Sequence, residues 1–235
     1  MLWLYIQVAL SALLGGKRSL REDGLRTLAR LPVQVEIRGR ENIPAQGPRL
    51  LTVNHYKQAG FKTWWLALGI AALVPVEMPW LMAAYWREPR HMRLLTRWFF
   101  PLLAKTYGFV LMPPMPPWPE ETAARAQSVR RVLALARENP ELVLGLAPEG
   151  GDQDSGALIE LPGGVGRFIL LLMPYCRTIT PVGVFFEGER LVYSFGEAYE
   201  LQAPAGLSPD ERDQWARKVV MHKIAELLPE NLRMK

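Results

Sequence analysis

The chain of 235 residues contains one cysteine and three histidines. A single cysteine excludes an internal disulfide framework and a four-thiolate metal site. Cys176 lies in the apolar run LLLMPYC, which is typical of a buried small side chain rather than of a nucleophile. His55 has no second histidine or cysteine at ligand spacing, and GGVG at 163–166 lacks the preceding strand of a dinucleotide fingerprint. We therefore expect neither a metal ion nor a bound cofactor.

The sequence also lacks a long apolar run and a strong excess of charge. Residues 1–16 are apolar-rich but shorter than the roughly 20 residues that span a bilayer. A net charge of +5 is modest, and the basic residues are scattered through apolar sequence rather than clustered in a polar stripe. Nucleic acid is therefore not an expected partner. A chain that is 49% apolar and 22% charged is expected to fold as an ordinary globular protein.

The N-terminal segment, residues 1–31, has the pattern of a helix that lies at a membrane surface. Trp3 and Tyr5 suit the lipid interface, and Lys17, Arg18 and Arg21 follow the apolar run. A secretory signal would carry its positive charge before that run. A helix packed on the protein's own core is the alternative. We predict a membrane-associating segment that precedes one domain, residues 32–235.

The remaining sequence alternates between strand and helix patterns. Strands are predicted at 33–39, 49–55, 107–112 and 142–151, with a hairpin at 179–196 and helices at 61–73, 120–137 and 208–228. The inner side of the helix at 120–137 is expected to consist of Ala126, Val129, Val132, Leu133 and Ala136. This alternation predicts an α/β fold with a mostly parallel or mixed sheet, covered by helices on both faces.

Polar chemistry follows two of the predicted strands. Asn54 and His55 end one strand, and the sequence PEGG at 148–151 ends another. Catalytic side chains in such sheets tend to lie beyond the carboxyl ends of strands. Histidine suits a general base because its ordinary pKa lies near neutral pH. However, no Asp or Glu lies between His55 and Phe61 to orient the imidazole.

Four segments occur in the order and spacing of a known family. They are NHYKQAG (54–60), GFVLMPP (108–114), APEGGDQDSG (147–156) and ITPVGV (179–184). With them, the chain resembles the glycerolipid acyltransferase superfamily, which contains the glycerol-3-phosphate and 1-acylglycerol-3-phosphate acyltransferases. The run GGVGRFILLL at 163–172 is similar to the family's glycine-plus-basic helix. The resemblance covers roughly residues 30 to 200.

The resemblance implies transfer of a fatty acyl group from acyl-coenzyme A or acyl carrier protein to the hydroxyl of a glycerolipid or lysophospholipid. His55 would be the general base, and no acyl-enzyme or bound cofactor would be needed. Substrate contacts are assigned to Asn54, Lys57, Glu149, Gly150 and Arg167. The implied partners are the membrane surface, the acyl donor and the lipid acceptor. The implied location is the cytoplasmic face of the membrane, with peripheral or monotopic attachment.

The sequence departs from the family pattern at the motif side chains. Gly60 occupies the position of the family's aspartate, Pro114 that of its arginine, and Gly151 and Asp152 those of its threonine and arginine. In one interpretation, the acceptor is not a simple phosphate monoester, and Asp152, Asp154 or Glu149 supplies the missing carboxylate. In another, the chain has kept the fold and lost the chemistry, and it binds lipid or an acyl chain. A thioesterase, with water as the acceptor, is a third possibility.

Overall fold

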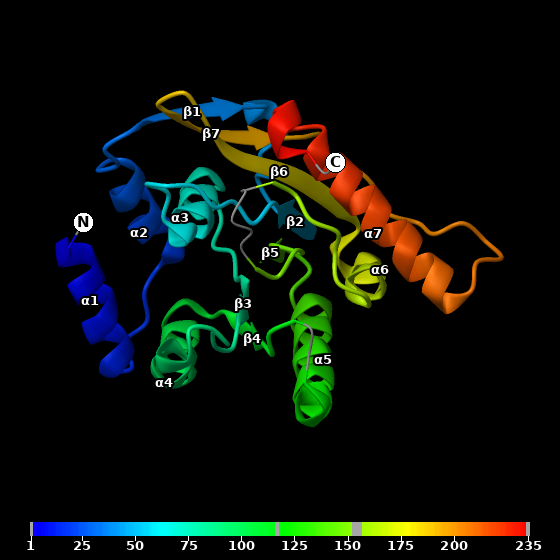
Figure 1. The fold of residues 1–235 in the computed structure, drawn as a ribbon, viewed down its shortest axis with the longest axis horizontal. Helices are drawn as coiled ribbons and strands as arrows, with labels where there is room; N and C mark the ends of the chain where they lie inside the picture. Colours follow the sequence, from blue (N-terminus) through cyan, green and yellow to red (C-terminus); the bar gives the residue numbers. More distant parts are fainter. Residues whose placement is uncertain (1, 116–117, 152–156, 234–235) are drawn as a thin grey trace.

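The computed structural model describes residues 2–115, 118–151 and 157–233. At its centre is a five-stranded sheet with the strand order β1-β7-β6-β2-β5 (Figure 1). The strands are β1 (Gln34–Arg38), β2 (Arg49–Val53), β5 (Val143–Leu146), β6 (Thr178–Glu187) and β7 (Arg190–Phe195). Only the β6–β7 hairpin is antiparallel, and the other three pairs are parallel. The predicted α/β class with a mostly parallel sheet is therefore confirmed.

Helices cover both faces of this sheet. On one face, the Tyr193 hydroxyl of β7 donates to the Trp65 carbonyl of α3 (Thr63–Leu73) at 2.9 Å. On the other, Gly183 of β6 lies against Leu227, just beyond α7 (Pro209–Ala225). Gly183 pairs with Ser194, the neighbour of Tyr193, and successive residues of a strand face opposite sides. The two helices therefore lie on opposite sides of the sheet.

A smaller parallel pair, β3 (Leu81–Ala83) and β4 (Val110–Met112), extends the main sheet beyond β5. The junction is a bridge between Trp80 and Gly145, whose N–H donates to the Pro79 carbonyl at 2.9 Å. The Trp80 indole lies over Gly145 so closely that a Cβ there would be 2.5 Å from the ring. Only glycine therefore permits this packing.

Helix α4 (Arg90–Tyr107) was not predicted, because its arginines and its internal Pro101 obscure the helical pattern. Tyr107 is the last residue of this helix, and β4 is therefore shorter than the predicted strand at 107–112. The described residues also form helix α6 (Val165–Cys176) and short 3₁₀ helices at Arg40–Asn42, Pro119–Glu121 and Glu230–Leu232.

Helix α5 (Thr122–Glu138) occurs where it was expected, and Val129, Val132, Leu133 and Ala136 of its predicted inner side contact the core, but Ala126 does not. Ala126 is exposed, whereas Ser128, Val132 and Ala136 are buried and Arg125 is half-buried. Arg125 lies seven residues before Val132, which is two helical turns and therefore the same side. The prediction for Ala126 was wrong because it followed apolar character and passed over this spacing.

The N-terminal residues form two helices, α1 (Leu2–Leu13) and α2 (Leu20–Leu28), which pack on α4 and α3 respectively. The buried carboxylate of Asp23 in α2 accepts two 2.6 Å hydrogen bonds from Arg18 and one of 2.8 Å from the Tyr107 hydroxyl. These bonds tie the segment between α1 and α2 to the end of α4. Among the described residues, no helix is long and apolar enough to span a membrane.

Candidate active site

His55 lies directly after the carboxyl end of β2, and Glu149 lies in the turn after the neighbouring strand β5. Since the two strands are parallel, their carboxyl ends meet at one edge of the sheet. There the Glu149 carboxylate accepts the backbone N–H of His55 at 2.6 Å and that of Ile159 at 3.1 Å. Glu149 is buried, with 3% of its surface exposed, whereas His55 is partly exposed. Glu149 therefore fixes the position from which His55 reaches the surface.

Asn54 has a comparable positioning role on the opposite side of β2. Its side-chain amide donates to the Val184 carbonyl at 2.9 Å and accepts the Val184 N–H at 2.7 Å. The side chain is buried, and it bonds to β6 as a further strand residue would. This arrangement holds the start of the His55 turn against the sheet. A contact between Asn54 and substrate stays a prediction.

The turn after His55 is anchored by an aromatic side chain. Tyr56 is buried against Phe61, and its hydroxyl accepts the Phe186 N–H at 3.2 Å and donates to Gln58. Lys57 is exposed, and its role in substrate binding stays a prediction. Tyr56 thus fixes the turn to β6 on the side away from Glu149.

Gly60, in place of the family's aspartate, has a left-handed backbone with φ of +84°. A Cβ built on Gly60 meets no atom within 4 Å. Glycine therefore suits the backbone conformation of this position, and the space beside it is open. Asp152 and Asp154, the proposed replacements for the motif carboxylate, lie outside the described residues.

Gly150 follows Glu149 and lines a small pocket of about 80 Å³ at the same edge of the sheet. The pocket is bounded by β3, by the ends of β4 and β5 with the segments that follow them, and by residues of α5 and α6. The helix residues are Arg125 of α5 and Val165 and Phe168 of α6. Most of these groups are apolar. Gly150 also has a left-handed backbone, with φ of +73°, so this turn favours glycine.

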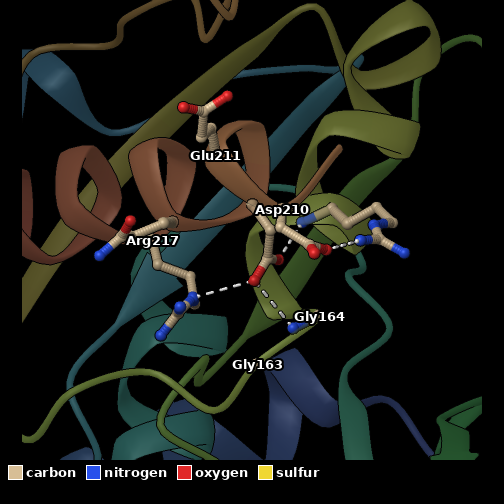
Figure 2. Close-up of a pocket in the computed structure, with 8 residues that line it drawn as sticks. Gly163, Gly164, Asp210, Glu211 and Arg217 are labelled. Atoms are coloured by element: carbon tan, nitrogen blue, oxygen red, sulfur yellow. Dashed lines mark hydrogen bonds and ion pairs between the residues drawn. The ribbon is translucent and has the colours of Figure 1, made fainter. Parts of the chain in front are cut away.

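Arg167 lies at a different pocket, of about 480 Å³, between the start of α6 and α7 (Figure 2). Its guanidinium pairs with Asp210 at 2.9 Å. The described lining of this pocket includes neither His55 nor Glu149. The structure therefore does not bring Arg167 together with them in one pocket, and a substrate contact stays a prediction.

The centre of the second pocket is a buried carboxylate that serves the fold. Asp213 accepts the N–H groups of Gly164 at 3.0 Å and Arg167 at 2.7 Å, and it pairs with Arg217 at 3.0 Å. Burial by itself raises the pKa of Asp213, but these N–H groups and the guanidinium outweigh it and hold the pKa below its ordinary value. Asp213 thus caps α6 from α7.

Cys176, the one cysteine of the chain, is buried. Burial raises the pKa of the Cys176 thiol to about 11, so that it is protonated at neutral pH. No group of three or more His, Cys, Asp or Glu side chains in the described ranges could hold a metal ion.

Comparison with known proteins identifies a similar fold. No protein-family model matches the sequence, and no curated protein matches it. Among solved structures, the chain is similar to the 1-acyl-sn-glycerophosphate (LPA) acyltransferase PlsC from Thermotoga maritima, with a TM-score of 0.54. The match covers 88% of this chain and 78% of that chain at 14% sequence identity. The two proteins share a fold. At this identity, the likeness supports the architecture expected from the motifs and leaves the reaction to be tested.

Proposed function

We propose that the protein is a glycerolipid-type acyltransferase in which His55 is the general base. The observation that carries this proposal is the position of His55, held by Glu149 at the carboxyl edge of a sheet with an acyltransferase fold. That edge is where α/β proteins of this kind place their reactive groups. Among the described residues there, His55 is partly exposed, and the Glu149 side chain that holds its backbone is buried and hydrogen-bonded.

The proposed reaction is a direct transfer. The imidazole of His55 takes the proton of the acceptor hydroxyl as its oxygen attacks the carbonyl carbon of the acyl thioester. The carbon–sulfur bond then breaks, and the leaving thiolate receives the proton from the imidazolium. Proton transfer by a positioned histidine typically contributes 10²–10⁴-fold in rate. Acyl-coenzyme A or acyl carrier protein would serve as the donor, and no bound cofactor takes part.

Glu149 and Asn54 are positioning residues in this proposal. The side chain of each forms hydrogen bonds with the backbone of a neighbouring turn or strand. They therefore act through the position of His55, and the earlier assignment of both to acceptor binding remains a prediction. An orienting carboxylate from Asp152 or Asp154 likewise remains a proposal.

We also propose that α1 and α4 hold the protein at a membrane surface on its cytoplasmic face. The two helices pack on each other, and both expose large apolar side chains. Trp3 of α1 is 65% exposed and Leu94 of α4 is 74% exposed, and Leu14, directly after α1, is 83% exposed. Exposed basic residues, Lys17, Arg90 and Arg97, accompany them. Apolar side chains flanked by basic ones favour the interface of an anionic bilayer.

The decisive experiment measures thiol release from long-chain acyl-coenzyme A by the purified protein in detergent. It is run with and without a panel of lysolipids and glycerol phosphates, beside His55→Ala and His55→Gln. His222→Ala is the matched control, because His222 is exposed on α7, where it pairs with Glu226. We expect release that requires an acceptor, that survives in the control and that falls at least 10²-fold in both His55 variants.

Other outcomes would favour the alternative functions. Release without an acceptor, lost in the His55 variants, would indicate a thioesterase. Equal background release by all proteins, with acyl carrier protein also failing as donor, would reject catalysis in favour of a lipid-binding protein with this fold.

A further inference from the structure

Arg125 is a half-buried cation on the inner face of α5. It is turned toward the sheet together with Ser128 and Val132, and its guanidinium donates to the Pro113 carbonyl at 3.3 Å. Within the described ranges, no carboxylate forms an ion pair with it. By contrast, Arg87, which reaches the adjacent Pro114 carbonyl, is paired with Glu121 at 2.7 Å. Among the described residues, Arg125 therefore has a carbonyl partner but no carboxylate partner, unlike Arg87.

The surroundings of Arg125 are unfavourable for a charge. It lines the pocket of about 80 Å³, and among the described residues that line it Arg125 alone is charged. The methionines Met82, Met112 and Met115 contribute to an otherwise mainly apolar wall. Burial lowers the pKa of Arg125, as expected for a cation removed from water. A partly desolvated guanidinium is stabilised by an anion, and its planar donors match a phosphate or carboxylate.

The pocket adjoins the segment that holds His55. Pro148 and Gly150 line the pocket, and Glu149 between them accepts the His55 N–H. The turn after β5 therefore contacts the pocket through two residues and His55 through the third. A volume of about 80 Å³ is small beside the roughly 300–1,000 Å³ of sites for whole drug-sized ligands. The pocket therefore suits one small group of a larger substrate.

From this arrangement we propose that Arg125 binds the phosphate group of the acceptor lipid. The inference rests on the proposed function, since it takes the edge at His55 as the reaction centre. It assigns a phosphorylated acceptor, such as a lysophosphatidate, to a chain whose motif positions lack the family's cations. It therefore opposes the interpretation that the acceptor is not a phosphate monoester. The same phosphate chemistry occurs in coenzyme A, so the test must separate acceptor from donor.

The test compares Arg125→Met and Arg125→Lys with wild type on lysophosphatidate and on the matching monoacylglycerol. Arg130→Met is the control, because Arg130 is an exposed arginine of the same helix. We expect the ratio of kcat/KM for lysophosphatidate over monoacylglycerol to fall at least 10-fold in Arg125→Met. It should fall less in Arg125→Lys, which keeps the charge without the planar donors, and stay unchanged in Arg130→Met. An unchanged ratio in Arg125→Met would overturn the proposal and leave Arg125 as an anchor for Pro113.

Two further experiments, one with a different acyl donor and one that measures binding, identify which phosphate Arg125 contacts. Acyl-coenzyme A is replaced by an S-acyl-N-acetylcysteamine, which has no phosphate. If the effect of Arg125→Met disappears with this donor, the phosphate belongs to coenzyme A, and the acceptor assignment is wrong. Calorimetric binding of lysophosphatidate is independent of turnover. If wild type binds it in preference to monoacylglycerol and Arg125→Met does not, Arg125 binds the phosphate group. Absent turnover beside this result would count against the proposed function and its acceptor, and not against the phosphate contact.

Discussion

The Glu149 carboxylate joins two turns by accepting backbone N–H groups from His55 and Ile159. Glutamine at this position has the same size but only one acceptor oxygen, and its NH₂ group would face one of the two donors. We expect Glu149→Gln to lower the free energy of unfolding by about 1–3 kcal/mol. Turnover should fall as well, because the base loses its support.

Urea unfolding and the thiol-release assay measure the two effects of Glu149→Gln. Glu141→Gln is the matched control, because Glu141 is exposed near the start of β5. Wild-type stability in Glu149→Gln would show that the two hydrogen bonds do not hold the turn.

Substitutions of Gly60 test whether the turn after His55 requires a left-handed backbone. Its surroundings are open, but its φ of +84° is unfavourable for a residue with a Cβ. We expect Gly60→Ala to destabilise the protein by about 1–2 kcal/mol and Gly60→Asn by less, since asparagine tolerates this conformation. Thermal unfolding measures the difference. Gly163→Ala is the control, because Gly163 is equally open without a positive φ. Equal stability of Gly60→Ala and wild type would contradict a strained turn.

At the scale of elements, α6 depends on α7 for its N-terminal cap. Asp213→Asn keeps the shape of the side chain but removes the charge that faces two N–H groups and Arg217. Because the pKa of Asp213 is lowered on folding, its charge stabilises the protein above the unfolded pKa of about 3.9. This contribution is lost as the pH falls through the folded pKa.

We therefore expect Asp213→Asn to be less stable than wild type by about 1–3 kcal/mol near neutral pH. The difference in the free energy of unfolding between wild type and Asp213→Asn should become smaller as the pH falls below about 3.9. Chemical unfolding of both proteins, from neutral pH to below about 3.9, measures this difference. Asp210→Asn, with an exposed carboxylate in the same pocket, should change stability by no more than about 0.5 kcal/mol. A gap that does not vary with pH would show that the charge of Asp213 is unimportant.

At the scale of the whole molecule, the exposed apolar side chains of α1 and α4 predict attachment to vesicles. Replacing Leu94 by Glu removes one buried leucine at the lipid surface, worth about 1.5–3 kcal/mol. Vesicle binding should therefore weaken by roughly 10-fold or more. It should also weaken with salt, because the basic residues attract anionic lipids.

Sedimentation with vesicles of anionic and of neutral lipid measures this attachment. Leu171→Glu is the control, because Leu171 is exposed on α6 rather than on α1 or α4. Equal binding by Leu94→Glu and wild type would place the membrane surface elsewhere or exclude it.

Much of the fold could be read from local patterns. The alternation of strands with helices predicted the α/β class, and the capping box at Ser208 located the start of α7. The sequence patterns failed to predict structure where it depends on contacts with residues distant in the sequence. Helix α4 was missed because its sequence is rich in arginine, and Arg125 was overlooked because its inward direction depends on what α5 packs against.

The sequence alone determined which chemistry is available: one histidine after a strand, a PEG turn after another, and glycine where an orienting aspartate was expected. These depend on residue type and order, which are local properties. Only the tertiary structure decided what these groups meet. The parallel pairing of β2 with β5 brings Glu149 to His55 across 94 positions. The packing of α5 brings Arg125 to the same edge of the sheet, because side-chain direction is set by contacts between elements distant in sequence.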